Sequence, residues 1–218
     1  SSSIDDVYVA TCDKEIESSI KSYGGKVIIT SNSHQNGTSR VAEAVENIDC
    51  SHVILLQGDE PLLLPRHIDS LVNEIILNPD GDSWNATGPI ELTEELDKHS
   101  FVKCSINENN RILYCFRRSP SYSNTQDQFL YIRKILGLIA FKKSFLLEIT
   151  KKNPTRIESL EFIEQMRIIE HGYLMTSVPV SPSLPSVNEP DEANVIIDHI
   201  KNDKEQKELL NKILDTKF

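Results

Sequence analysis

The first 80 residues alternate between two hydrophobic patterns, and this alternation restricts the possible folds more than any other feature of the chain. Short β-branched runs are each followed by an amphipathic stretch of helical period. The extended runs are residues 7–11, 26–30 and 52–57, and the helical stretches are residues 14–25, 39–48 and 66–78. Strands that alternate with helices of this length predict an α/β fold with a mainly parallel sheet.

The second half of the chain departs from this alternation. Residues 101–116 contain two extended runs around an Asn-Glu-Asn-Asn turn, which is typical of a β-hairpin. Residues 134–149 predict a strand that enters a helix, and residues 158–172 predict one continuous helix that ends at a glycine. A further strand at 173–180 and a final helix follow.

The charge balance narrows the classes of partner. The chain has 23 Lys and Arg against 33 Asp and Glu, a formal net charge of -10. We therefore expect no nucleic-acid partner, because phosphate backbones attract clustered Lys and Arg, although a nucleotide substrate remains compatible. We expect no membrane partner, since no apolar run is long enough to span a bilayer. Four widely spaced cysteines argue against structural zinc and indicate reduced thiols in a cytoplasmic protein.

The apolar run from Val53 ends in the sequence Gln-Gly-Asp-Glu-Pro, which places two carboxylates at a strand end. In an open α/β sheet, ligands bind beyond the carboxyl ends of the strands, and Gly58 would let a ligand approach the backbone. A hard cation such as Mg²⁺ prefers carboxylates together with phosphate oxygens, so Asp59 is a candidate metal ligand. The alternative is that Asp59 and Glu60 stabilise the start of the next helix. We interpret Glu60 as the structural acid of the two.

Two basic motifs have both a functional and an ordinary interpretation. Residues 33–40 form a polar turn at Gly37 that leads into a helix start, where Arg40 could reach a phosphate or a base. The alternative is a plain helix cap with a solvated Arg. Arg117 and Arg118 leave a strand beside aromatic residues, which suits bidentate binding of an acidic substrate. An edge strand with solvated charges explains them equally well.

Two later segments carry further polar candidates. Within the helix predicted at 158–172, Phe162, Met166 and Ile169 form the core stripe. Glu164 and Gln165 lie beside this stripe and could bind sugar hydroxyls, or form a solvated face. Asn188 precedes a Glu-Pro-Asp-Glu helix start. Its amide oxygen could bind a metal together with Asp59, or it could simply cap the helix.

The order of these motifs is more specific than any one of them. The series HQNGTSR, QGDEP, FRRSP, IESLEFIEQMRIIEHG and VNEPDEAN resembles the cytidylyltransferases that activate 3-deoxy-manno-octulosonate (Kdo), the CMP-Kdo synthetases. The resemblance runs from about residue 7 to about residue 200. It implies a Rossmann-like nucleotide-diphospho-sugar transferase fold with a mixed, mainly parallel sheet. It also implies a single domain over 1–218, with a hairpin insertion at about 101–132 that serves dimerisation.

The resemblance further implies a reaction and a set of residues. The anomeric hydroxyl of a 2-keto-3-deoxy acid sugar would attack the α-phosphorus of CTP, giving a CMP-sugar for surface polysaccharide (lipopolysaccharide) synthesis and pyrophosphate. Mg²⁺ is the implied cofactor, CTP and the acidic sugar are the substrates, and a second copy of the chain is the partner in a homodimer. The implied catalytic residues are Asp59 and Arg118, and the implied metal ligands are Asp59 and Asn188. The implied nucleotide-binding residues are Gly37, Arg40 and Gln57, and the implied sugar-binding residues are Gln57, Arg118, Glu164 and Gln165.

The chain also departs from the family pattern at several points. No counterpart of the family's basic phosphate-binding loop, of the type R-x-x-S-T-R-L-P-G-K, is present, so we expect either a fragment or weak triphosphate affinity. Ile135 and Ile139 stand where the family has His and Tyr, which points to a different or modified acidic sugar. Asn188 and Ser39 each stand where an Asp is usual. Two alternatives follow: CMP transfer to an amino-octulosonate or a nonulosonate, or a non-catalytic homologue that binds a nucleotide.

Overall fold

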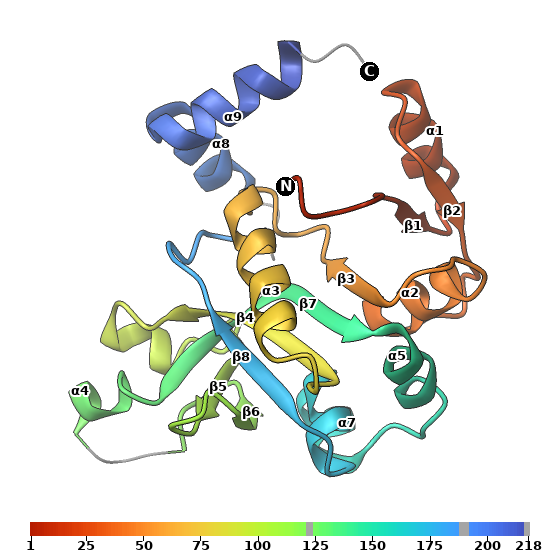
Figure 1. The fold of residues 1–218 in the computed structure, drawn as a ribbon. Coiled ribbons are helices and arrows are strands. Elements are labelled where there is room, and N and C mark those ends of the chain that lie inside the picture. Colours follow the sequence, from red (N-terminus) through yellow and green to blue (C-terminus); the bar gives the residue numbers. More distant parts are fainter. Residues whose placement is uncertain (121–123, 188–191, 216–218) are drawn as a thin grey trace.

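The computed structural model describes residues 1–120, 124–187 and 192–215 (Figure 1). The first half contains β1 (Val9–Thr11), α1 (Lys14–Ser22), β2 (Val27–Ile29), α2 (Gly37–Val45), β3 (His52–Leu56), α3 (Pro65–Leu77), β4 (Ser83–Pro89) and a 3₁₀ turn (Thr93–Leu96). The second half contains β5 (Lys103–Ile106), β6 (Ile112–Phe116), α4 (Thr125–Gln128), β7 (Ile132–Lys142), α5 (Lys143–Ile149), α6 (Arg156–Glu161), α7 (Gln165–Glu170), β8 (Met175–Pro179), α8 (Glu192–Asn202) and α9 (Lys204–Asp215).

The main sheet is mixed, as the sequence predicts. Its order is β6-β5-β7-β4-β8, with β3 also paired to β7, while β1 and β2 form a separate parallel pair. The pairing directions make β3, β4, β5 and β8 run the same way within the described part of the chain, with β6 and β7 opposed. Most hydrogen-bonded neighbours are nevertheless antiparallel, because β7 lies between β3 and β4 and also pairs with β5.

Strand β7 organises the core because its side chains alternate between the two faces of the sheet. Leu136, Leu138 and Ala140 pack with the apolar face of α3. Ile139 and Phe141 pack on the opposite face, in a second cluster to which α2, α5 and α7 contribute. The sheet is therefore covered by α3 on one side and by α2, α5 and α7 on the other (Figure 1).

Strand β4 is the element that the sequence pattern does not reveal. Its sequence, Ser-Trp-Asn-Ala-Thr-Gly-Pro, is polar, yet Ser83, Asn85 and Thr87 are fully buried between β7 and β8. Each has a partner there: Ser83 donates to the carbonyl of Leu174, Asn85 donates to the carbonyl of Leu136, and Thr87 bonds the Ser177 hydroxyl at 2.8 Å. Satisfied hydrogen bonds make the burial of these groups tolerable.

The prediction of one continuous helix over residues 158–172 is wrong. The chain forms α6 and α7 with a break at Phe162, whose φ of 55° and ψ of 47° are left-handed. Left-handed backbone cannot continue a right-handed helix, so α6 ends at Phe162. Phe162 is 82% exposed instead of joining the core stripe, whereas Met166 is buried as that stripe predicts. Gly172 ends α7 at a φ of 82°, in agreement with the predicted glycine stop.

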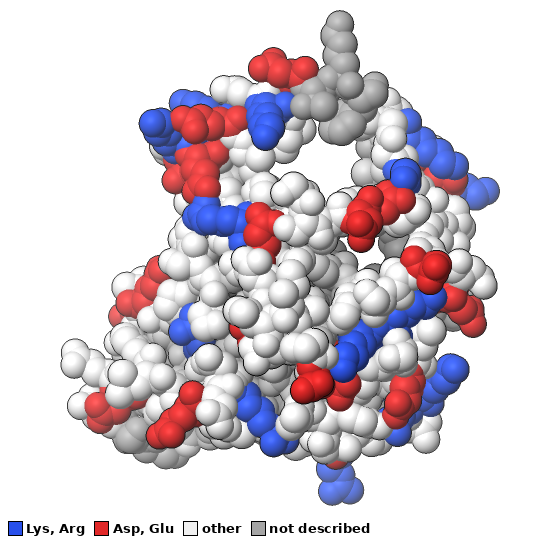
Figure 2. Space-filling view, in the orientation of Figure 1, with Lys and Arg blue, Asp and Glu red and all other residues white. Residues whose placement is uncertain are grey.

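The hairpin predicted at 101–116 is present as β5 and β6, which pair antiparallel with Cys104 opposite Cys115. β5 also pairs with β7, so the hairpin extends the main sheet. None of the helices in the described ranges is long and apolar enough to cross a membrane. Figure 2 shows Lys and Arg side chains interspersed with Asp and Glu over this face of the molecule, in keeping with the net negative charge.

Candidate active site

A cleft of about 720 Å³ opens beyond the carboxyl end of β3, and this is the place where the strand pattern predicts ligand binding. Its walls come from the QGDEP turn, the segment 98–102, the start of β7, the break between α6 and α7, and residues 182–186. Segments far apart in the sequence therefore surround one cavity. A cleft of this size with a mixed apolar and polar wall is typical of small-molecule sites.

The QGDEP turn is fixed to Gly137 of β7 by two hydrogen bonds. The backbone N–H of Gln57 donates to the Gly137 carbonyl at 2.8 Å, and the Gly137 N–H donates to Oε1 of Glu60 at 2.8 Å. A Cβ at Gly137 would lie only 2.9 Å from Cβ of Gln57 and 2.9 Å from Cγ of Glu60. Glycine is therefore required here for close approach.

The two acids of this turn have different surroundings. Glu60 is engaged with the backbone of β7, and its burial raises the pKa of its carboxyl above the ordinary value, with a further contribution from the nearby Asp59 charge. Asp59 lines the cleft, and its Oδ1 is buried without a hydrogen-bond partner in the described part of the chain. Buried oxygens normally have partners, so Asp59 has the unfulfilled bonding capacity expected of a ligand-binding acid. This agrees with the interpretation of Glu60 as the structural acid.

The second predicted metal ligand, Asn188, lies outside the described residues. The chain just before it is placed, since the N–H of Val187 donates to the backbone carbonyl of Asp59 at 2.8 Å. Among the residues that the structure describes, no group of three or more His, Cys, Asp or Glu side chains is arranged to hold a metal ion.

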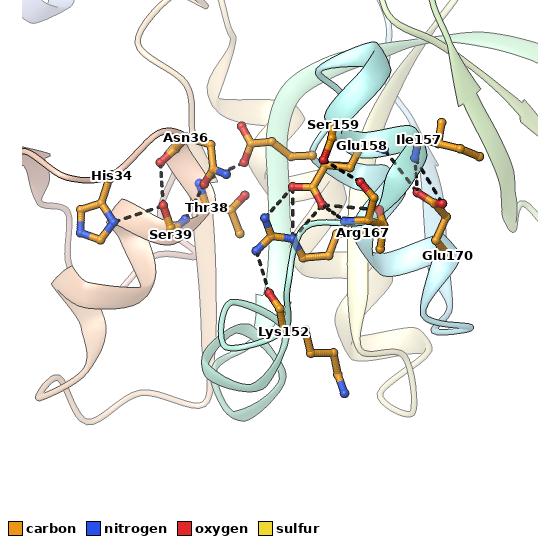
Figure 3. A network of polar contacts seen from close by, with 12 residues as sticks. His34, Asn36, Thr38, Ser39, Lys152, Ile157, Glu158, Ser159, Arg167 and Glu170 are labelled. Atoms are coloured by element: carbon orange, nitrogen blue, oxygen red, sulfur yellow. Dashed lines mark hydrogen bonds and ion pairs between the residues drawn. The ribbon is translucent and has the colours of Figure 1, made fainter.

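The start of α2 brings a predicted nucleotide-binding segment next to a predicted sugar-binding residue (Figure 3). Asn36 caps the helix by accepting from the N–H of Ser39 at 2.9 Å. Oε2 of Glu164 accepts from the N–H of Thr38 at 3.2 Å, so the carboxylate of the residue that precedes α7 contacts the first turn of α2, next to Gly37. A carboxylate is favoured at this position by the helix dipole.

A buried ion pair holds α6 and α7 together behind this contact (Figure 3). Arg167 donates to both oxygens of Glu158, with distances of 2.6 to 3.1 Å. Glu158 also accepts from the N–H of Thr155 at 3.0 Å and closes the capping box of α6. No predicted role covered this pair, although Glu158 and Arg167 lie nine residues apart within the predicted helix at 158–172.

Gln165 and Glu164 are adjacent, but their surroundings differ. Gln165 is 8% exposed and donates to Oδ1 of Asn85 in β4 at 3.1 Å, so it is tied into the sheet while still lining the cleft. Ile135 also lines the cleft. Ile139 is fully buried in the core and borders a separate cavity of about 20 Å³ near Glu164. Of the two isoleucines that replace the family's His and Tyr, only Ile135 is on the wall of the large cleft.

The predicted arginines lie away from this wall. Arg40 donates to Thr30 at 2.8 Å and to the carbonyl of Ser31 at 3.2 Å, beside β2. Arg118 is exposed and is not part of the cleft wall, so its role stays a prediction. Arg117 does line the cleft, although the resemblance implied a role only for its neighbour.

Comparisons with known proteins agree with this geometry. A family described as cytidylyltransferase matches residues 1–177. The chain belongs to the cytidylyltransferase family. A 3-deoxy-manno-octulosonate cytidylyltransferase from Fusobacterium nucleatum is 31% identical over 92% of this chain and 82% of its own length. An 8-amino-3,8-dideoxy-manno-octulosonate cytidylyltransferase from Shewanella sediminis is 35% identical over 87% of this chain and 78% of its own length.

The structure of a CMP:2-keto-3-deoxy-manno-octonic acid synthetase in complex with CTP matches with a TM-score of 0.83. The two proteins are 27% identical, over 91% of this chain and 81% of that one. These findings confirm the predicted family and the Rossmann-like nucleotidyltransferase fold. In this cytidylyltransferase, the structure brings Gln57, Asp59, Glu164 and Gln165 together on one cleft, with Gly37 next to it.

Proposed function

We propose that this cytidylyltransferase couples CTP to a Kdo-like 2-keto-3-deoxy acid sugar, giving a CMP-sugar and pyrophosphate for surface polysaccharide synthesis. The observation that carries the proposal is Asp59. It stands at the carboxyl end of β3 on the wall of a 720 Å³ cleft, with a buried oxygen that has no partner among the described residues. The names of the relatives from Fusobacterium and Shewanella support the class of sugar.

Asp59 also fits a magnesium ion. Mg²⁺ prefers one or two carboxylates together with substrate phosphate oxygens, and Oδ1 of Asp59 offers such a ligand. Asn188 would supply a neutral oxygen from the chain that follows Val187. When bound, the ion would neutralise charge on the phosphates.

The residues of the chain would act mainly by alignment. In the reaction, the anomeric oxygen of the sugar forms a bond to the α-phosphorus, the bond to the pyrophosphate oxygen breaks, and the hydroxyl proton is released. No protein nucleophile is required, and positioning can account for a large part of the acceleration. The start of α2 at Gly37, with Arg40 behind it, would hold the cytidine. Gln57, Glu164 and Gln165, which line the cleft, would orient the sugar.

The test is pyrophosphate release by the full-length gene product with CTP, Mg²⁺ and a panel of acidic sugars. We expect release with a 2-keto-3-deoxy acid sugar and a loss of at least 100-fold in kcat for Asp59→Asn, by analogy with the removal of one stabilising group. Glu60→Gln is the matched control, because it is adjacent and isosteric and should retain activity. Absence of release with every acidic sugar would refute the proposed function.

A modified sugar is the second candidate, and Ile135 favours it. The family pattern has a His at this position, whereas the cleft here presents an aliphatic side chain. The hydroxyl that a His would bind is then left without a partner, which disfavours an unmodified sugar. The Shewanella sediminis relative is named for an 8-amino sugar. The same assay, run with 8-amino and unmodified octulosonates and with nonulosonates, separates these substrates by their kcat/KM.

We further propose a homodimer formed through the region of residues 101–132. Leu113 and Leu130 in this region are 48% and 82% exposed. Leu113 lies on β6, which ends the strand order of the main sheet in the described part of the chain, so this edge is open to a second copy. Sedimentation of Leu113→Lys/Leu130→Lys against the parent protein tests this, with a shift to monomer expected. Because the reaction consumes CTP, we place the enzyme in the cytoplasm, where this nucleotide is made.

A further inference from the structure

Phe162 combines two features that are unfavourable unless something compensates for them. It is a bulky residue with left-handed backbone, and its side chain is 82% exposed. The other non-glycine residue with positive φ in the described ranges is Asn110, a type that tolerates this conformation in turns. An aromatic side chain that is so exposed gains little stability from packing, which leaves the backbone strain without compensation from the ring. Strain of this kind is concentrated at functional sites.

The strained turn is held in place by Arg117. Its Nε donates to the carbonyl of Glu161 at 2.9 Å and its Nη2 to the carbonyl of Phe162 at 3.3 Å. Its Nη1 donates to the carbonyl of His99 at 3.1 Å, between Lys98 and Ser100, which line the cleft. One guanidinium therefore satisfies carbonyls that the broken helix leaves unpaired, and it joins two walls of the same cavity.

The break also directs the residues around it to separate places. Ile163 is buried in the core, Glu164 contacts the start of α2, and Gln165 contacts β4. A continuous helix would place residue 162 on the same stripe as the buried Met166. Because of the break, Phe162 instead becomes part of the cleft wall.

We propose that Phe162 is a specificity-determining residue whose ring contacts the acidic sugar, and that Arg117 is the residue that positions it. This inference rests on the proposed function. An aromatic face packs well against the C–H edge of a deoxy sugar, and ligand pockets commonly combine such a surface with a few polar groups. Phe162 and Ile135 would supply the apolar surface, and Gln57 and Glu164 the polar groups.

The experiment compares Phe162→Gly and Phe162→Asn with the parent. Both substitutions suit left-handed backbone, so we expect a melting temperature that is not lowered. We expect the KM for the sugar to rise roughly 3- to 10-fold, the value of one lost aromatic contact, with the KM for CTP within about twofold. Phe162→Tyr keeps the ring and should restore the parental KM. Leu160→Ala is the matched control, because Leu160 is 71% exposed on α6 and does not line the cleft.

Arg117→Lys tests the positioning role, since the three carbonyls are bonded by three different nitrogens of the planar guanidinium and the single ammonium nitrogen of Lys cannot reach all three positions. It should raise the sugar KM in the parent but add nothing in the Phe162→Gly background. Additive effects would overturn the role of Arg117. An unchanged sugar KM in Phe162→Gly would overturn the role of Phe162. The role of Phe162 would also be overturned if the sugar KM of Phe162→Gly rose together with a change in oligomeric state, because the ring would then be an interface contact.

Direct sugar binding, measured by saturation-transfer NMR without CTP, separates this inference from the proposed function. Loss of binding in Phe162→Gly supports the inference even if turnover is absent. A parent that turns over the sugar while Phe162→Gly binds it normally overturns the inference alone. A parent that neither binds nor turns over an acidic sugar overturns both.

Discussion

The contact between β7 and the QGDEP turn gives the most quantitative prediction, through the substitution Gly137→Ala. The added Cβ would lie 2.7 Å from Oε1 of Gln57, 2.9 Å from its Cβ and 2.9 Å from Cγ of Glu60. The amide oxygen can rotate away, but Cβ of Gln57 can move only with the turn. Cγ of Glu60 can move by a side-chain rotation, which would break the hydrogen bond from the Gly137 N–H. Moving the turn would also stretch the two 2.8 Å hydrogen bonds at Gly137.

Overpacking of a well-packed site costs about 1–3 kcal/mol. For a chain of this size each kcal/mol lowers the melting temperature by about 2–4 °C, so we expect a fall of about 2–12 °C for Gly137→Ala. Because the same shift displaces the wall that carries Asp59, kcat/KM should fall as well. Thermal melting followed by circular dichroism, combined with the pyrophosphate assay, measures both effects.

Gly58→Ala is the matched control from the same turn. A Cβ at Gly58 meets nothing within 4 Å, and its φ is not positive. Stability should therefore stay the same or rise by about 0.4–1 kcal/mol, because alanine restricts the unfolded chain. If a ligand approaches the backbone at Gly58, this variant raises the substrate KM without a loss of stability. Equal melting temperatures for Gly137→Ala and Gly58→Ala would refute the packing argument.

Three further predictions follow from buried groups. Glu60 has a pKa raised above its ordinary value of 4.5 by burial, so its contribution to stability is full at low pH and declines as pH rises through the folded-state pKa. Glu60→Gln should remove this decline. Urea unfolding of metal-free protein between pH 4.5 and 8 should therefore show a difference in the free energy of unfolding between variant and parent that grows with pH. Arg167→Met leaves the buried carboxylate of Glu158 without its ion pair and should lower the free energy of unfolding by about 3–5 kcal/mol. If urea unfolding shows a decrease of less than about 1 kcal/mol, the pair does not stabilise the fold as argued. Cys12 is exposed, whereas Cys104 is buried and its pKa is raised to about 12 by desolvation. After alkylation of the native protein at pH 8, mass spectrometry should find Cys12 labelled and Cys104 protected until the protein unfolds. Labelling of Cys104 before unfolding would contradict its burial.

Local patterns in the sequence determine much of the fold. The continuous apolar run before Gln57 predicts β3, and the glycine at 172 predicts the end of α7, because both depend on neighbours a few residues away. The polar turn at 107–110 likewise predicts the hairpin of β5 and β6. The position of Asp59 at a strand end is part of the same local information.

Tertiary structure decided the features that depend on distant partners. Strand β4 is polar in sequence, and only its burial between β7 and β8 supplies the hydrogen bonds for Asn85 and Thr87. The break at Phe162 contradicts the helical period, and the carbonyls it exposes are satisfied by Arg117, 45 residues earlier. The sequence by itself therefore determined the strands and helices that follow from local periodicity, together with the position of the acids at a strand end. The cleft and the residues that face it depend on long-range hydrogen bonds, which no local pattern records.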